Sequence, residues 1–157
     1  MAVSSACYVY AIMDPTTPVT PAEFAAYYDL RYRVLRAPWN QPLGSERADD
    51  DEAPDTTHAM LTAPDKTVVG VARLHPSGPS QGQVRYMAVD PAWQGHGVGR
   101  KLLEYLETVA RQRGLTECIL HARDTAVPFY SRMGYEVVAP SHTLFGSIPH
   151  FLMCKPL

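Results

Sequence analysis

The chain has no long apolar run. No stretch of its 157 residues approaches the roughly 18 consecutive apolar residues of a membrane-spanning helix. The first basic residue is Arg31, so the start of the chain lacks the charged region that opens a secretory signal peptide. We therefore expect a cytoplasmic protein with no membrane partner.

Cysteine and net charge are also scarce. Cys7, Cys118 and Cys154 match no disulfide framework and no metal-binding spacing, which favours free thiols in a reducing compartment and no metal. Lys and Arg number 14 against 16 Asp and Glu, a formal net charge of −2. A nucleic-acid-binding protein would instead show a basic face. No nucleic-acid partner is expected.

The length predicts a single domain that spans residues 1–157, with 46% hydrophobic residues to build its core. Strand and helix patterns alternate irregularly along it, which indicates an α+β fold with a mixed central sheet. A turn is expected at 78–83. Three helices are predicted: one begins at 20 and runs to about 35, one ends at 113, and a short one lies within 124–134. The predicted strands are 7–13, 57–62, 66–74, 84–89, 116–122, 135–139 and 148–155.

A strand, a glycine-rich turn and an amphipathic helix follow one another at 84–113. Pro91 ends the strand because proline cannot donate to a sheet ladder. The helix is predicted by apolar residues at 3.6-residue spacing, with Gly114 as its stop. That apolar face comprises Val98, Leu102, Leu103, Leu106, Val109 and Ala110. The opposite, charged face comprises Arg100, Lys101, Glu104, Glu107 and Arg111.

The turn contains Gly95, Gly97 and Gly99. Glycines let backbone N–H groups approach a ligand, and the start of a helix favours an anion such as a pyrophosphate. A P-loop is excluded because Arg100-Lys101 follows the last glycine where Lys-Ser or Lys-Thr is needed. The dinucleotide-binding fingerprint also fails, because the last glycine interval is wrong.

Two motifs resemble those of a known family. The letters Q-G-H-G-V-G at 94–99, after a strand and a proline, resemble the Q/R-x-x-G-x-G/A coenzyme A signature of the GNAT acetyltransferases. The letters A-V-P-F-Y-S-R-M-G-Y at 126–135 resemble the second hallmark of the same family. The two motifs stand at the separation expected in that family.

The resemblance implies the GNAT fold, in which a mixed, mostly antiparallel sheet is flanked by helices and a splayed strand pair holds coenzyme A. It also implies acetyl-CoA as co-substrate, with the strand backbone at 87–89 holding the pantetheine arm and the turn holding the pyrophosphate. The implied cofactor-binding residues are Met87, Ala88, Val89, Gln94, Gly95, His96, Gly97, Val98, Gly99, Arg100, Asp124 and Tyr130.

Tyr130 stands where the family keeps its general acid. A phenol with an ordinary pKa near 10 stays protonated at neutral pH, so it can give a proton to a departing thiolate. Asp124 is expected first as a helix N-cap and second as a contact to the coenzyme arm. The general base stays open among a carboxylate acting through water and the side chains of His75, Tyr86, His121 and His150.

The acceptor is open: a small amine, a peptide N-terminus or a lysine. Trp39, in a proline-rich loop, is either a packing anchor, which we favour, or an acceptor contact. The acidic block at 49–52 is expected as a solvated turn, with attraction of a cationic acceptor as the alternative. Monomer and homodimer both fit the sequence. The rivals to an N-acetyltransferase are a non-catalytic coenzyme A-binding module and a nucleotide-binding protein.

Overall fold

The computed structural model of the chain describes residues 13–157 and contains a six-stranded sheet in the order β1-β2-β3-β4-β6-β5. Within this range only β3 and β4 pair in parallel, and the other neighbours are antiparallel. The strands are β1 (Thr57–Thr62), β2 (Val68–Pro76), β3 (Gln81–Val89), β4 (Glu117–Arg123), β5 (Glu136–Leu144) and β6 (Ile148–Pro156). The helices are α2 (Pro21–Leu35), α3 (Val98–Gln112) and α4 (Val127–Arg132), with 3₁₀ turns η1 (Ala37–Trp39), η2 (Pro91–Trp93) and η3 (Asp124–Ala126).

The predicted α+β class with a mixed sheet is confirmed. The strand expected at 7–13 lies outside the described residues except for Met13, which is in no strand. β3 begins at Gln81, where a turn was expected, because the Ser77 N–H closes a tighter turn on the Gln81 carbonyl at 2.9 Å. β5 continues to Leu144, five residues beyond the expected end, because it pairs with β6 up to their connecting turn. No helix of residues 13–157 is long and apolar enough to cross a membrane.

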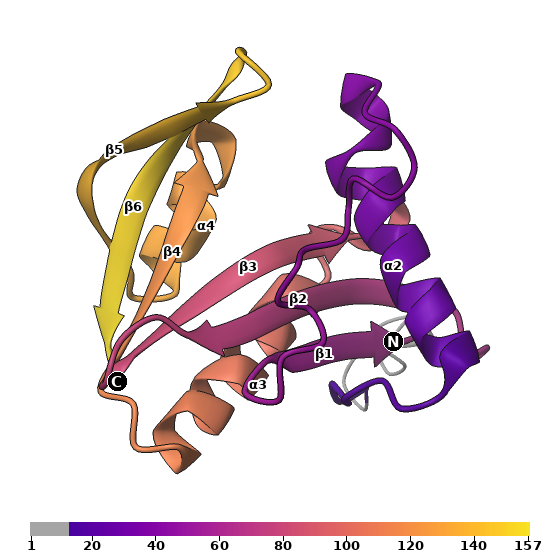
Figure 1. Cartoon of the computed structure of the whole chain (residues 1–157), viewed down its shortest axis with the longest axis horizontal. Coiled ribbons are helices and arrows are strands. Elements are labelled where there is room, and N and C mark those ends of the chain that lie inside the picture. Colours follow the sequence, from indigo (N-terminus) through magenta and orange to yellow (C-terminus); the bar gives the residue numbers. More distant parts are fainter. Residues whose placement is uncertain (1–12) are drawn as a thin grey trace, which may run out of the picture.

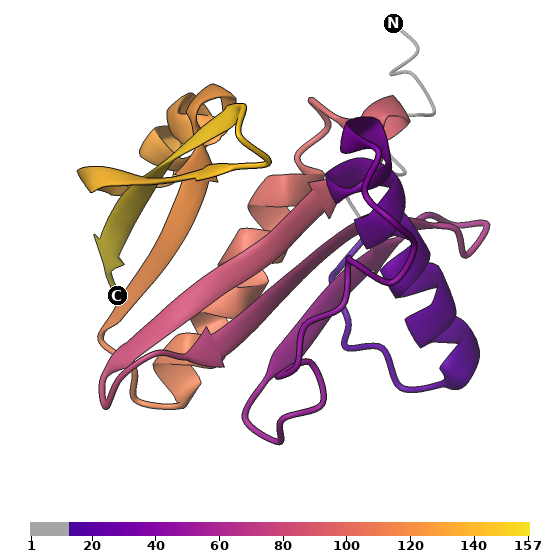
Figure 2. The same cartoon turned by 45° about the horizontal axis from the view of Figure 1, so that its top comes forward.

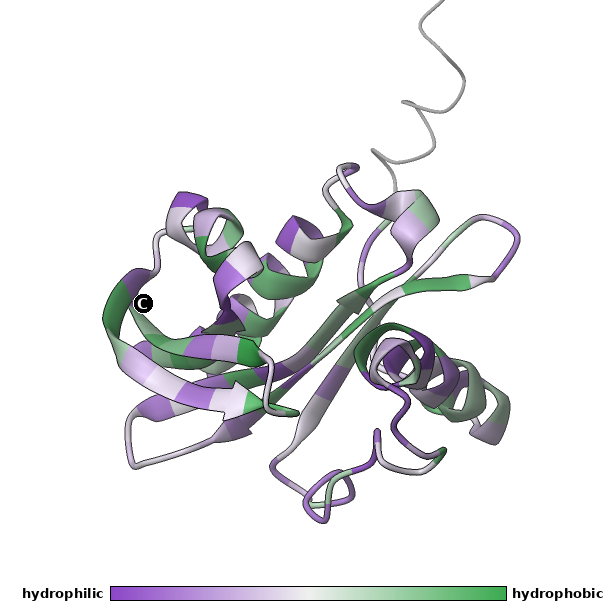
Figure 3. Cartoon of the chain, turned by 90° about the horizontal axis from the view of Figure 1, so that it is seen from above, coloured by the Kyte–Doolittle hydropathy of each residue, from purple (hydrophilic) through white to green (hydrophobic). Residues whose placement is uncertain are grey.

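Two helices cover opposite faces of the strands β1 to β3 (Figures 1 and 2). The start of α2 is set locally, since Thr20 and Glu23 form a capping box and Pro21 occupies the first turn. Its inner face buries Tyr27 and Leu30 against the sheet. Figure 3 shows hydrophobic residues concentrated in the strands between these two helical layers.

The helix α3 buries the apolar face that its periodicity predicts, with Leu102, Leu103 and Leu106 fully buried. It packs close to β2 because Gly70 has no side chain: a Cβ on Gly70 would overlap Val98 Cγ1. One position differs from the prediction. Glu107, expected on the charged face, is 2% exposed and accepts from Lys155 Nζ at 2.7 Å and from the Tyr135 hydroxyl at 3.1 Å.

The strands β3 and β4 separate like the arms of a V (Figure 1). They pair only at residues 81–83 with 117–119, whereas β4 continues alongside β6 as far as Arg123. From Val84 onward β3 therefore has no strand partner on its β4 side. This is the splayed pair expected of the GNAT fold.

A β-bulge lies on β3 beside this opening. The register with β2 shifts between the pairs Val71–Ala88 and Arg73–Arg85, and Tyr86 has a φ of 57°. Such a conformation is rare for a residue with a Cβ and marks a bulge that redirects side chains. In consequence Tyr86 reaches the cavity described next.

Candidate active site

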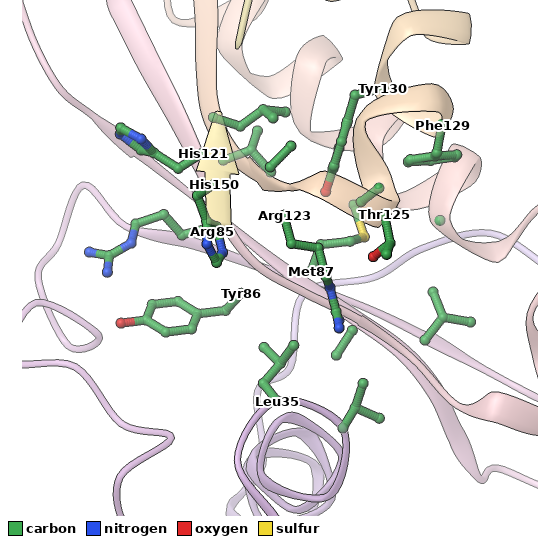
Figure 4. A pocket seen from close by; sticks show the side chains of 18 of the residues that line it. Leu35, Arg85, Tyr86, Met87, His121, Arg123, Thr125, Phe129, Tyr130 and His150 are labelled. Carbon is green, nitrogen blue, oxygen red and sulfur yellow. The ribbon is translucent and has the colours of Figure 1, made fainter. Parts of the chain in front are cut away.

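A cavity of about 1010 Å³ occupies the gap between β3 and β4 (Figure 4). It extends from the glycine turn before α3 to the end of α2 and the β5–β6 hairpin. Because β4 diverges from β3 after residues 81–83, alternate N–H and C=O groups along this edge of β3 lack a strand partner and can bind an extended ligand. The cavity therefore offers one polar backbone edge along its length.

The glycine turn forms one end of the cavity. Gly95 and Gly97 have φ values of 77° and 81°, and a Cβ on either would meet nothing within 4 Å. Glycine is therefore required there by the left-handed backbone, not by space. Gly97 is the N-cap of α3 and has no side chain to accept from the helix, so the first N–H groups stay available to an anion. Gly99 instead lets Phe129 approach, because a Cβ there would lie 3.3 Å from the Phe129 ring.

Most of the predicted cofactor-binding residues lie around this cavity, and two do not. His96 is an exposed turn residue outside the lining. Asp124 is also outside it and is not the predicted N-cap, because it is the first residue of η3 and Ala126 caps α4. The Asp124 carboxylate accepts from the Thr125 N–H at 2.9 Å instead. Those in the lining are Met87, Ala88, Val89, Gln94, Gly95, Gly97, Val98, Gly99, Arg100 and Tyr130.

Tyr130 projects from α4 into the middle of the cavity, and its hydroxyl points toward Met87 and Arg123 (Figure 4). Its ring is held edge-on between Phe129 and Tyr135, at centroid distances of 5.0 and 6.0 Å. Burial raises the pKa of Tyr130 to about 12, against a smaller lowering by the Arg123 guanidinium. The phenol is therefore protonated at neutral pH.

Three of the four side chains considered as bases line the cavity, and His75 does not. The Arg73 guanidinium donates to His75 Nδ1 at 3.2 Å, so the other nitrogen of the neutral ring carries the proton. His150 has the opposite tautomer, because its Nδ1 must donate to the Ile148 carbonyl at 2.9 Å. Burial is the main cause that lowers the pKa of His150, so Nε2 keeps a free lone pair at neutral pH.

For the remaining two candidates, His121 and Tyr86, the contacts do not establish a basic atom. His121 Nδ1 lies 2.6 Å from the Ser141 hydroxyl, which can donate or accept and leaves the tautomer open. Tyr86 lies with its ring 4.3 Å from the Arg31 guanidinium carbon and 4.8 Å from that of Arg85. His142 stacks on His150 at 4.6 Å and had no sequence signal.

Among residues 13–157, no three His, Cys, Asp or Glu side chains are grouped to hold a metal.

The acidic block is a turn, as expected, but only part of it is solvated: Asp49 and Glu52 are exposed, whereas Asp50 and Asp51 bind buried arginines. Asp51 is 7% exposed and binds Arg31 Nη1 at 3.0 Å and Arg73 Nη1 at 2.7 Å. Asp50 binds Arg73 as well, at 2.7 Å. The two arginines are fully buried, and their carboxylate partners were not recognisable from the sequence because they come from distant segments. Two of the four carboxylates at 49–52 thus neutralise buried cations.

Trp39 is both a packing residue and part of the cavity lining. It lies in η1 with its ring 6.3 Å from Phe145 in the β5–β6 turn. The Arg123 guanidinium lies 5.5 Å from the same ring. The loop after α2 and the β5–β6 turn therefore meet at the end of the cavity opposite the glycine turn.

Known proteins share the sequence pattern and the fold of this chain. The model described as "Acetyltransferase (GNAT) family" matches residues 24–135. YjcF of Bacillus subtilis, named as an uncharacterised N-acetyltransferase, is 30% identical over 115 residues, which cover 73% of this chain and 81% of that protein. The crystal structure of an acyl-CoA N-acyltransferase from Pseudomonas aeruginosa is similar at a TM-score of 0.77 and 26% identity, over 91% of this chain and 99% of the other.

A third protein is similar in fold alone. It is an aminoglycoside 6′-N-acetyltransferase complexed with coenzyme A, with a TM-score of 0.78 at 16% identity, over 92% of this chain and 97% of the other. Family match and fold comparison thus agree on the GNAT fold of this chain. The chain belongs to the GNAT acetyltransferase family.

Proposed function

We propose that the protein is an N-acetyltransferase that moves an acetyl group from acetyl-CoA to a primary amine by direct attack in a ternary complex. The observation that carries the proposal is one continuous cavity, with the start of α3, which no side chain caps, at one end and Tyr130 in its lining. Family membership supports acyl transfer and coenzyme A binding in general. The direct route and the amine are the proposal.

The residues present fit acetyl-CoA, which would supply the acetyl thioester. The unpartnered N–H groups that begin α3 would hold the diphosphate, and the free edge of β3 at Met87 to Val89 would orient the pantetheine. Aligning amine and thioester in one cavity removes much of the entropic barrier to their reaction.

Two proton transfers complete the reaction. Tyr130 Oη holds a proton at neutral pH and can give it to the departing sulfur. The attacking ammonium must lose a proton, and we infer that His150 Nε2 accepts it, since the Ile148 carbonyl fixes this nitrogen in its basic form. The inference narrows the four candidates by tautomer and by position in the cavity.

The test is a thiol-release assay with acetyl-CoA and a panel of amines. Tyr130→Phe should lower kcat by about 100-fold or more, the usual contribution of a general acid, with little change in the Kd for acetyl-CoA. The matched control is Tyr105→Phe, because Tyr105 lies outside the cavity lining and its hydroxyl is hydrogen-bonded to Thr17 within residues 13–157. Tight coenzyme A binding without turnover on any amine would support the non-catalytic module instead.

A further inference from the structure

The end of the cavity beyond Tyr130 is lined by basic side chains and by no acidic one. Arg36, Arg85 and Arg123 face it, together with the histidines at 121, 142 and 150. Among the described residues that line the whole cavity there is no Asp and no Glu. The binding space for the acceptor is therefore positive on every side that carries charge.

These three arginines have no carboxylate partner within 4.0 Å in residues 13–157. Arg36 donates only to backbone carbonyls, those of Leu35 at 2.9 Å and Ser45 at 3.0 Å. Arg85 is exposed and Arg123 lies against Trp39. The contrast is with Arg31 and Arg73, whose charges are balanced by the acidic block.

The acidic block contributes no carboxylate to this cavity for a cationic acceptor to bind. The carboxylates of Asp50 and Asp51 are bound by Arg31 and Arg73, and no residue of 49–52 lines the cavity. A cationic amine such as a polyamine would therefore meet uncompensated positive charge.

The phosphates of coenzyme A do not account for these charges either. The glycine turn provides its own backbone donors, with Arg100 beside it. Arg85 precedes Val89, the last residue of β3, by four strand positions, which is about 13 Å of extended chain. Arg36 approaches Tyr86 and Phe145, on the opposite side of the cavity from the turn.

The rim at this end is narrowed by contacts of the β5–β6 turn with η1 and with the C-cap of α2. Trp39 meets Phe145, and the Arg36 guanidinium lies 5.5 Å from the Phe145 ring. A protein lysine or a long peptide needs an open groove at this point. The contacts favour a small molecule.

We propose that the acceptor is a small primary amine that also carries an anionic group, a carboxylate or a phosphate, which Arg36, Arg85 and Arg123 bind. The proposal rests on the proposed function and names the substrate class of the same site. Guanidinium groups bind both anions through paired hydrogen bonds.

The positive surroundings also serve the reaction. After burial, the neighbouring charges that lower the pKa of His121 include Arg85, and those that lower the pKa of His150 include Arg123. The same field lowers the pKa of an amine placed there, which increases its neutral, nucleophilic fraction. An anionic tail held by the arginines would bring such an amine into the field.

The test uses matched pairs of amines that differ only in the anionic group: α-amino acids against their amides, and glucosamine 6-phosphate against glucosamine. The preferred anionic member should exceed its neutral partner in kcat/KM by about tenfold to a hundredfold, the effect of one charge-assisted hydrogen bond. The pairs separate carboxylate from phosphate as the recognised anion. Equal or reversed preference in every pair would overturn the proposal.

Arg85→Gln should remove that preference and keep the fold, because Arg85 is exposed and its side chain makes no hydrogen bond or ion pair within residues 13–157. Arg111→Gln, an exposed arginine on α3 outside the cavity, is the matched control and should keep the preference. If Arg85→Gln discriminates as well as the parent protein, the proposed recognition is wrong.

A binding measurement separates this proposal from the proposed function. The protein saturated with coenzyme A, which cannot react, is heated with each amine, and the shift in Tm is recorded. Stabilisation by the anionic members that disappears in Arg85→Gln supports the acceptor class even if no turnover is found. Turnover of neutral or cationic amines alone would uphold the acetyltransferase and refute the anionic acceptor.

Discussion

The buried charge cluster between α2 and β2 gives the sharpest prediction about stability. Arg31 and Arg73 are both fully buried, and Asp51 contacts both guanidinium groups, at 3.0 and 2.7 Å. Neither arginine Nε has a hydrogen-bond partner, so the cluster has no spare acceptor. Asp51→Asn keeps the shape of the side chain but removes its charge and one acceptor oxygen.

The expected cost follows from what the substitution leaves behind. Arg73 keeps Asp50, whose side chain is 45% exposed, but Arg31 keeps no carboxylate within residues 13–157. Breaking a buried ion pair by removing one partner costs about 3–5 kcal/mol. Since natural domains unfold at about 5–15 kcal/mol, Asp51→Asn should remain folded only marginally.

Urea denaturation followed by tryptophan fluorescence measures the effect. With an m-value of about 2 kcal/mol per molar urea, the midpoint should fall by about 1.5–2.5 M. The control is Asp49→Asn in the same block, an exposed residue whose change should stay within about 0.5 kcal/mol. A loss below about 1 kcal/mol in Asp51→Asn would refute the argument that this carboxylate neutralises the buried arginines.

Acid provides a second reading of the same cluster. Burial alone would raise the pKa of Asp51, but the Ala48 N–H and the two guanidinium groups together lower it by more. The pKa of Asp51 therefore lies below the ordinary value. The carboxylate's contribution is thus present above the unfolded pKa of about 3.9 and is lost as pH falls through the folded pKa. Stability of Asp51→Asn should lack this acid-dependent loss.

Three further predictions concern the site and its surroundings. Gly97→Ala should lower the free energy of unfolding by about 1–2 kcal/mol and weaken coenzyme A binding measured by calorimetry, because the φ of Gly97 is 81°. The control Gly44→Ala, at a φ of 99° and outside the cavity, should show the same strain but keep the affinity for coenzyme A. Burial lowers the pKa of His58, so the free energy of unfolding should decline as pH falls below about 6.5, where the unfolded chain binds the extra proton. His58→Gln should flatten that decline, and an unchanged pH dependence would contradict the role assigned to His58. His150→Gln should lower kcat and abolish the acid limb of the pH–rate profile. That limb should lie below pH 6.5 because burial lowers the pKa of His150, and an intact limb in the variant would point to another base.

Local patterns predicted the parts of the fold that depend on neighbouring residues. The capping box at Thr20, the apolar periodicity of α3 and the glycine turn each act within one or two turns of chain, so their consequences could be stated in advance. The cavity lining could be named through the resemblance, which supplied Tyr130 and the strand at 84–89. Most of those residues do line the cavity, although their roles stay predictions.

Predictions failed where a partner comes from far along the chain. Glu107 was expected in solvent, but it is buried against Lys155, 48 residues away. Asp51 was expected in a solvated turn, but Arg73, 22 residues on, reaches it from β2. Asp124 was expected to cap a helix, but η3 intervenes before α4. In each case the local sequence gives the same polar pattern whether the partner is water or a distant side chain.

By itself the sequence determined the order of strands and helices, the glycine turn before α3 and, through its two motifs, the family. Only the tertiary structure decided which charges the site contains. Folding pairs Asp50 and Asp51 with arginines buried between α2 and β2 and leaves Arg36, Arg85 and Arg123 without carboxylates at the cavity. The sign of a binding site depends on which charges are neutralised by contact, and such contacts exist only once segments distant in sequence have packed together.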